Sequence, residues 1–350
     1  MTDANGSIGQ LPWEGDPLYS PFRRTDYYGI LGLRPLPLHE KLRLAVLACV
    51  LVPAKLLGAL CCLLAYYCIC RFSVLVPRSL RSDFIAATGK VACRSCLFCL
   101  GFYKVEWIQV EPGAAPHSRR ARRNGRSPAA IVSNHCGWSD ILVHMSRSFP
   151  AFVARDATKN MPLIGLISQL MGCIYVNREH KDPSSNGVAA LVKERIKAAA
   201  EGKLPDSRPL LLFPEGTTTN GEYLLPFKTG AFLAGAPVQP VILCYGKGRI
   251  SLSWEMIPAP RHLFLVLCNP LHSVTCYELP VYVPSPEEQA DPKLYANNVR
   301  KYMLEFAGLK DTRATFNDKM RLMAQIRSYY GLPVKRLPAP TAEPIVKKEE

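Results

Sequence analysis

The sequence predicts an α/β protein, with a layered domain of strands and helices preceded by membrane helices. Between residues 104 and 285, short apolar runs typical of strands alternate with segments of helical spacing, which favours helices packed on a sheet. From Leu42 to Val76 the chain is almost continuously apolar. This stretch exceeds the roughly 20 apolar residues that a bilayer-spanning helix needs.

The composition favours anionic partners. The 350 residues include 43 Lys and Arg against 28 Asp and Glu, a formal net charge of +15. Such an excess attracts nucleic acid, acidic lipid headgroups or phosphorylated co-substrates. The 13 cysteines do not indicate a disulfide framework, because their number is odd and several lie within the most apolar stretch. We interpret them as small buried hydrophobic residues in a reducing compartment.

The N-terminal third is expected to contain the membrane-associated part. Residues 1–40 hold scattered Gly, Pro and Asp, which predicts a mostly disordered cytosolic tail. Residues 41–103 are expected to form membrane-embedded and interfacial helices. Pro53 and Lys55 interrupt the apolar stretch and leave two alternatives. A single kinked span would separate the N-terminus from the following domain, whereas a re-entrant helix pair hinged at residues 53–55 would keep both on one side.

The remaining elements are predicted from apolar runs and their spacing. Residues 84–103 suit an amphipathic helix at the membrane interface. Strands are predicted at residues 104–111, 129–133, 152–154, 174–176, 209–213, 237–244 and 264–268. Helices are predicted to begin near Ser139 and Met161, and to span residues 187–202, 291–306 and 311–330.

A histidine and a carboxylate lie five positions apart just after one apolar run, as His135 and Asp140. Five residues along a helix turn through about 500°, so on one helix the two would not share a face. Gly137 allows the chain to turn between them. Asp140 would then accept the proton of one imidazole nitrogen and leave the other as a general base.

A covalent nucleophile is the alternative at the same place. Cys136 adjoins the base in sequence, and its thiolate could form an acyl-enzyme; Ser139 is a second candidate.

A second polar segment, Glu215-Gly216-Thr217, follows the apolar run 210–213. Gly216 would let backbone N–H groups approach an anion, and the threonines add hydroxyl donors. Together the two segments predict a site that deprotonates a hydroxyl beside a bound anionic group.

Four ordered segments resemble the sequence blocks of glycerolipid acyltransferases, and the chain is most similar to plant-type lysophosphatidylethanolamine acyltransferases. The segments are His135-x4-Asp140, residues 172–178, residues 213–217 and Val238-Gln239-Pro240-Val241. The resemblance implies a glycerol-3-phosphate acyltransferase-like mixed sheet flanked by helices, with N-terminal membrane helices. It assigns residues 104–285 to the acyltransferase catalytic domain. The helical patterns that follow predict C-terminal helices in residues 286–332, and the Pro- and Lys-rich composition of residues 333–350 predicts a tail.

The resemblance also implies roles for individual residues. His135 would be the general base and Asp140 its orienting partner. Substrate would be bound by a set that contains two arginines, namely Arg155, Asn177, Arg178, Glu215, Gly216 and Thr217. Within this set Arg178 would contact the acceptor's phosphodiester and Glu215 its glycerol. Relatives commonly have Lys in place of Arg155 and often Asp in place of Asn177, so these two positions depart from the pattern.

The implied activity is transfer of an acyl chain from acyl-CoA to the free hydroxyl of a lysophospholipid. Lysophosphatidylethanolamine is the expected acceptor, with lysophosphatidylcholine next; a lysophosphatidate acyltransferase is the alternative. Acyl-CoA would be a co-substrate, and neither a cofactor nor a metal is expected. A distant alternative is a non-catalytic basic scaffold or RNA-binding protein that uses the arginines of residues 119–126, although no nucleic-acid motif supports it, so no nucleic acid is expected.

The chain end carries lysines at the third and fourth positions from the C-terminus, Lys348 and Lys347. They resemble the dilysine signal that returns membrane proteins to the endoplasmic reticulum. This resemblance implies an endoplasmic reticulum membrane protein with a cytosolic C-terminus. The basic loop 119–126 would contact the bilayer or the phosphates of CoA, or would be merely solvated.

Overall fold

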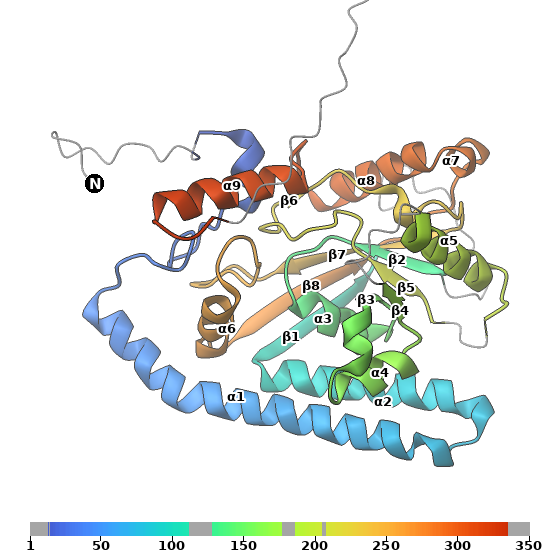
Figure 1. The fold of residues 1–350 in the computed structure, drawn as a ribbon, viewed down its shortest axis with the longest axis horizontal. Coiled ribbons are helices and arrows are strands. Elements are labelled where there is room, and N and C mark those ends of the chain that lie inside the picture. Colours follow the sequence, from blue (N-terminus) through green and yellow to red (C-terminus); the bar gives the residue numbers. More distant parts are fainter. Residues whose placement is uncertain (1–12, 14, 112–127, 177–185, 205–207, 335–350) are drawn as a thin grey trace, which may run out of the picture.

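A five-stranded mixed sheet lies at the centre of the protein (Figure 1). This computed structural model describes residues 13, 15–111, 128–176, 186–204 and 208–334. The strands run in the order β1-β8-β7-β2-β5, and only the β7–β8 pair is antiparallel. Their bounds are β1 Phe102–Gln109, β2 Ala130–Ser133, β5 Leu210–Leu212, β7 Val238–Tyr245 and β8 His272–Glu278. The predicted α/β fold with a mixed sheet is confirmed.

Two short parallel pairs form separate two-stranded sheets, and helices cover the central sheet. The pairs are β3 Val153–Arg155 with β4 Ile174–Val176, and β6 Tyr223–Leu224 with β9 Lys310–Asp311. The helices of the domain are α3 Ser139–Arg147, α4 Ile164–Leu170, α5 Asn186–Ala200, α6 Ala259–Cys268, α7 Pro286–Ala290, α8 Pro292–Ala307 and α9 Phe316–Tyr329.

Each face of the sheet carries its own apolar core. One core joins the sheet to α5 and α8, with Ile196 and Val299 fully buried. The other joins it to α3, α6 and the N-terminal helices, with Val143 and Leu265 buried. Burying one such side chain contributes about 1.5–3 kcal/mol, so the two cores hold the strand ends, and the loops that follow them, in fixed positions.

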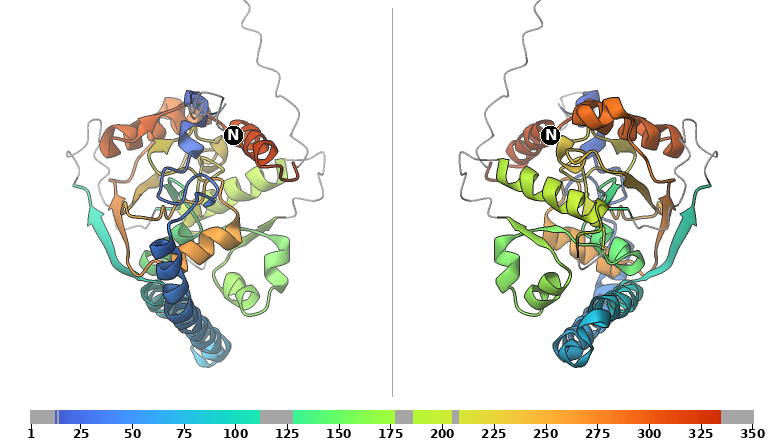
Figure 2. Two further views of the ribbon diagram at one scale, coloured as in Figure 1. Left: turned by 90° about the vertical axis from the view of Figure 1, so that its left-hand side faces the viewer. Right: turned by 90° about the vertical axis from the view of Figure 1, so that its right-hand side faces the viewer.

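Of the two alternatives left open by the sequence, a hinge at residues 53–55 is not what the structure shows. Helix α1 is continuous from Leu38 to Phe72 and passes through Pro53. The chain reverses later, through a 3-10 turn at Ser73–Leu75, and α2 returns from Arg78 to Cys99. Figure 2 shows α1 and α2 side by side at the end of the molecule away from α8 and α9.

Lys55 remains inside this helix because its charge has a partner. The side chain is buried, and Nζ donates a hydrogen bond of 2.6 Å to the carbonyl of Asn269. Gly58 allows the close approach of α2, since a Cβ there would lie 2.9 Å from Sγ of Cys99. Helix α1 with its following turn, Leu38–Leu75, is long and apolar enough to cross a membrane. Only 6% of its most apolar 18-residue segment is buried within the protein.

The part of the N-terminal region that the structure describes is not a disordered tail. Residues 15–37 fold back on the domain, with a 3-10 helix at Pro17–Phe22. Phe22 and Trp13 are buried in a cluster with α9. The prediction failed because these aromatic side chains have no periodicity in the sequence, and their partners in this cluster, which include Leu225, Met256 and residues of α9, are distant in the chain. Residues 1–12 and 14 lie outside the described residues.

One strand was predicted where a helix forms. Residues 264–268 lie within α6, and the strand beside β7 is β8, which begins at His272. A short apolar run fits a buried strand or a buried helix equally well. Pro258 and Pro260 at its start favour a helix, because proline is well tolerated in a first helical turn. The other predicted strands and helices are present, with ends shifted by a few residues.

Candidate functional site

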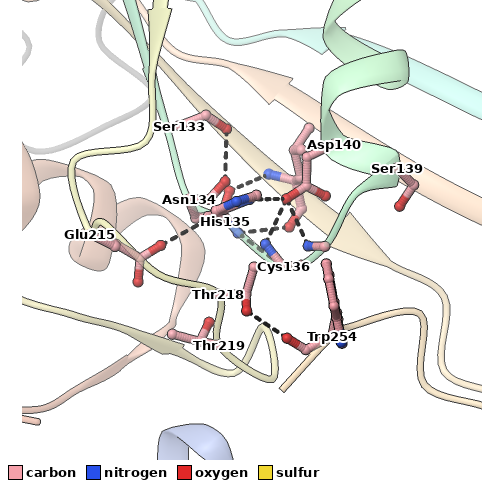
Figure 3. A network of polar contacts seen from close by, with 12 residues as sticks. Ser133, Asn134, His135, Cys136, Ser139, Asp140, Glu215, Thr218, Thr219 and Trp254 are labelled. Carbon is pink, nitrogen blue, oxygen red and sulfur yellow. Dashed lines mark hydrogen bonds and ion pairs between the residues drawn. The ribbon is translucent and has the colours of Figure 1, made fainter. Parts of the chain in front are cut away.

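His135 lies in the turn between β2 and α3, and Asp140 lies in the first turn of α3 (Figure 3). Nδ1 of His135 is 2.7 Å from Oδ2 of Asp140. The Asp140 side chain is fully buried, whereas 22% of the His135 side chain is exposed. The predicted turn therefore brings the pair together, and Nε2 is the ring nitrogen left for a substrate proton.

Asp140 is held by its own turn as well as by the histidine. Its Oδ2 accepts hydrogen bonds from the backbone N–H groups of Cys136 at 2.6 Å and Gly137 at 2.9 Å. Its Oδ1 accepts a hydrogen bond from the hydroxyl of Tyr245 at the end of β7. Several donors on one buried carboxylate compensate its charge and fix its direction.

The backbone of His135 is bound by the second predicted segment. Its N–H donates to Oε1 of Glu215 at 2.8 Å, and its carbonyl accepts from the N–H of Thr219 at 2.9 Å. The ring of Phe213 stacks on the imidazole, with centroids 4.0 Å apart and planes inclined by 13°. These contacts fix the imidazole on one side while its other face remains accessible.

Glu215 connects two loops of the site through hydrogen bonds. Its carboxylate is buried, and Oε2 accepts from the N–H of Leu225 at 2.9 Å. Burial raises the pKa of this carboxyl to about 8, although the two backbone N–H groups oppose the shift. Glu215 does not line either cavity described below. Its contacts join the His135 turn to the β6 region, and its contact with the acceptor's glycerol stays a prediction.

Two cavities reach His135 among the described residues. The first, of about 950 Å³, is mainly apolar and extends to α1, α2 and α4. The second, of about 790 Å³, lies between the loop 254–259 and α9. His135 and Gly216 line both cavities, and Thr217 lines the second. The imidazole is therefore placed where groups bound in the two cavities could meet.

Gly216 needs to be glycine at this junction. Its φ is +71°, and a Cβ there would lie 2.5 Å from Nζ of Lys228. Lys228 is exposed and lines the first cavity beside His135. Lys228 therefore places a positive charge near His135. No motif in the sequence indicated this lysine.

Of the remaining predicted substrate residues, Arg155 is the one that the structure describes. Arg155 is exposed at the end of β3 and lines neither cavity. Asn177 and Arg178 follow β4 and lie outside the described residues, as do the arginine-rich loop 119–126 and the dilysine tail.

The two candidate nucleophiles do not favour a covalent mechanism. Cys136 is fully buried, and burial raises the pKa of its thiol well above the usual value, so its reactive thiolate is disfavoured. Ser139 is buried as well, and its hydroxyl donates a hydrogen bond of 2.9 Å to Tyr245.

Besides Lys228, the sequence did not indicate Tyr245 or Asn134, because the segments that carry them show no catalytic or binding motif. Tyr245 ends β7, a largely apolar strand. Asn134 is buried beside His135, and its side chain donates to the carbonyl of Leu243 at 3.0 Å and accepts from its N–H at 2.8 Å. The position of Asn134 directly before His135 was the only available signal.

Comparison with known proteins agrees with this geometry. Residues 115–244 match the family described as Acyltransferase. Lysophospholipid acyltransferase LPEAT1 of Arabidopsis thaliana is 40% identical over 367 residues, covering 91% of this chain and 90% of that protein. Human lysophosphatidylcholine acyltransferase 1 is 30% identical, covering 88% of this chain and 56% of that protein. Human lysophospholipid acyltransferase LPCAT4 is 35% identical, covering 64% and 40%.

Among solved structures, the 1-acyl-sn-glycerophosphate acyltransferase PlsC of Thermotoga maritima aligns with a TM-score of 0.49 and 16% identity, covering 78% of this chain and 99% of that one. The identity and coverage of the plant relative, together with the match over residues 115–244, show that this chain belongs to the acyltransferase family and is an O-acyltransferase.

Proposed function

We propose that this protein transfers an acyl chain from acyl-CoA to the free hydroxyl of a lysophospholipid, with His135 as the general base. The observation that carries the proposal is the position of His135, oriented by Asp140 at 2.7 Å and shared by two cavities. The similarity to proteins named lysophospholipid acyltransferases supports the class of acceptor.

The proposed reaction is a direct transfer. Nε2 of His135 removes the proton from the lysophospholipid hydroxyl while that oxygen attacks the thioester carbonyl carbon. The C–O bond forms, the C–S bond of the collapsing intermediate breaks, and the CoA sulfur takes the proton back from the imidazolium. Asp140 stabilises the transient imidazolium and keeps Nδ1 protonated throughout. The products are a diacyl phospholipid and free CoA.

The first cavity suits the acyl chain. Its lining is dominated by aliphatic and sulfur-containing side chains, including Ile141, Leu142 and Met145 of α3. It also reaches Leu63 and Cys93 in the N-terminal helix pair. A long alkyl chain binds through such apolar surface at about 0.8 kcal/mol per buried CH₂.

Lysophosphatidylethanolamine is the proposed acceptor, because the sequence blocks resemble those of plant-type lysophosphatidylethanolamine acyltransferases and a plant lysophospholipid acyltransferase is similar over 91% of this chain. Lysophosphatidylcholine and lysophosphatidate are the alternatives. The proposed location is the endoplasmic reticulum membrane with a cytosolic C-terminus, supported by the apolar helix α1 and by the tail lysines.

The first prediction concerns His135. Purified protein is supplied with labelled acyl-CoA and a panel of the three lysolipids, and the labelled product is quantified. His135→Ala is expected to lower transfer by about 100- to 10,000-fold, the range for loss of a general base. His39→Ala, an exposed histidine at the start of α1, is the control and should retain activity. Transfer that is unchanged in His135→Ala would exclude His135 as the general base. The best acceptor in the panel decides the headgroup.

A further inference from the structure

Helix α9 forms one wall of the second cavity. The cavity begins at His135 and the turn Gly216–Thr218, and it continues along α9 past Lys319, Met323 and Arg327. Trp138 and Trp254 line it as well. Helix α9 lies outside residues 115–244, where the chain matches the family. Nothing described so far assigns this cavity a ligand.

Lys319 is a buried cation beside the catalytic turn. Its Nζ donates to the carbonyl and the hydroxyl of Thr218 at 2.7 and 2.8 Å, and to the hydroxyl of Thr217 at 3.2 Å. Among the described residues, no carboxylate forms an ion pair with it. A buried ammonium without a counter-charge is costly, and neutral oxygens compensate it only in part. Burial accordingly lowers the pKa of Lys319 to about 8.

The charge balance of the cavity is positive. Arg327, about two turns further along α9, is half-buried and lines the same wall. The acidic side chain in the lining, Glu255, is already paired with Arg24 at 3.0 Å, and both side chains are fully buried. The cavity therefore presents two cationic side chains and no uncompensated carboxylate among its described lining residues, which favours an anionic ligand.

The position of the cavity indicates which substrate it receives. Helix α9 lies at the opposite end of the domain from the α1–α2 pair (Figures 1 and 2). The first cavity extends to that pair, which contains the long apolar helix α1. The second cavity is lined instead by α9, away from this apolar pair, which favours a polar, water-soluble group as its ligand.

We propose that Lys319 and Arg327 of α9 bind a phosphate group of the acyl donor's CoA moiety in the second cavity, with its thioester directed toward His135. This inference rests on the proposed function. Phosphate is the chemistry that the two cations recognise, and the phosphodiester of the lysophospholipid is the other possible source of it. Cationic side chains bind phosphate by charge-assisted hydrogen bonds.

The test separates the two sources of phosphate. KM and kcat are measured for Lys319→Met and Arg327→Met with each substrate varied in turn, with Lys301→Met on the exposed face of α8 as the matched control. Free CoA and glycerophosphoethanolamine are added separately as competitors. Arg327 lines the cavity and is only half-buried, so Arg327→Met is expected to fold. If Lys319→Met does not fold, Arg327→Met alone tests the proposal.

The expected result is a rise of about tenfold in KM for acyl-CoA, the loss expected for one charge-assisted interaction. KM for the lysophospholipid and the kinetics of Lys301→Met should not change, and inhibition by free CoA should weaken. A rise in KM for the lysophospholipid alone would contradict the CoA site. It would instead show that the two cations bind the phosphodiester of the lysophospholipid headgroup. An active enzyme in which neither KM changes, or in which only kcat falls, would overturn the phosphate site. Absence of transfer in the unchanged protein would count against the proposed function instead.

Discussion

Asp140 accepts hydrogen bonds from two backbone N–H groups and from Tyr245, in addition to its contact with His135. Of these hydrogen bonds, the one from Tyr245 can be removed by a conservative substitution. The Tyr245 hydroxyl donates to Asp140 and accepts from Ser139. Burial raises the pKa of this phenol well above its usual value, so it stays protonated as a donor. Without it, the Asp140 carboxylate would concentrate more negative charge on the oxygen that faces His135.

The residue-scale prediction follows from the loss of that donor. Tyr245→Phe removes a hydrogen bond that holds the Asp140 carboxylate against Nδ1 of His135. We therefore expect kcat/KM at neutral pH to fall about tenfold, as expected for loss of a hydrogen bond to a charged group. Tyr277→Phe on the neighbouring strand β8 is the control. An unchanged kcat/KM in Tyr245→Phe would mean that Tyr245 only packs the strand.

At this scale, the sequence predicted local contacts of the site better than distant ones. His135 and Asp140 were identifiable because base and carboxylate lie within one turn, where local spacing decides whether they meet. Glu215 was found in the sequence but its contacts were not, since its partners are backbone N–H groups of His135 and Leu225. Tyr245 and Lys319 are more than 100 residues from His135, and only the folded chain brings them together.

At the scale of elements, the segment before α1 is the largest departure from the predictions. Arg24 anchors it through a buried pair with Glu255 at 3.0 Å and a hydrogen bond to the carbonyl of Ser251 at 2.8 Å. Asn220 also contacts this segment, because its side-chain amide donates to the carbonyl of Ser20 at 2.9 Å. The N-terminal segment thereby contacts the two loops, around residues 216–220 and 251–259, that border the second cavity. Low periodicity in a sequence does not imply disorder when the partners are distant.

Removing the anchor should loosen this segment. Arg24→Met leaves Glu255 as an uncompensated buried carboxylate, which typically costs about 3–5 kcal/mol. We expect a lower thermal midpoint in detergent solution and faster proteolysis of the N-terminal region. The exposed Arg34→Met is the matched control. Adding Glu255→Gln to Arg24→Met should recover part of the loss, and equal stability of Arg24→Met and the unchanged protein would show that the segment is held by its aromatic side chains alone.

At the scale of the whole molecule, the helix pair begins and ends on the same domain. The segment before α1 is bonded to the loop 251–255, and β1 after α2 is paired with β8. Helix α1 itself touches the domain along its length, since Leu44 packs in the cluster with α6, and Tyr66 in the cluster with α4. Hydropathy alone left both topologies open, because an apolar helix of this length can cross a bilayer or lie along its surface.

These contacts lead to a prediction about topology. Because residues 15–37 and the sheet form one folded unit, the N-terminus and the C-terminus should lie on the same side of the membrane. The test uses sealed microsomes with an epitope tag at each end of the chain and protease added outside. Both tags should be digested together, while a lumenal marker is protected until detergent is added. Protection of the N-terminal tag alone would contradict this arrangement, because a chain that crosses the bilayer once within α1 could not also place Arg24 against Glu255.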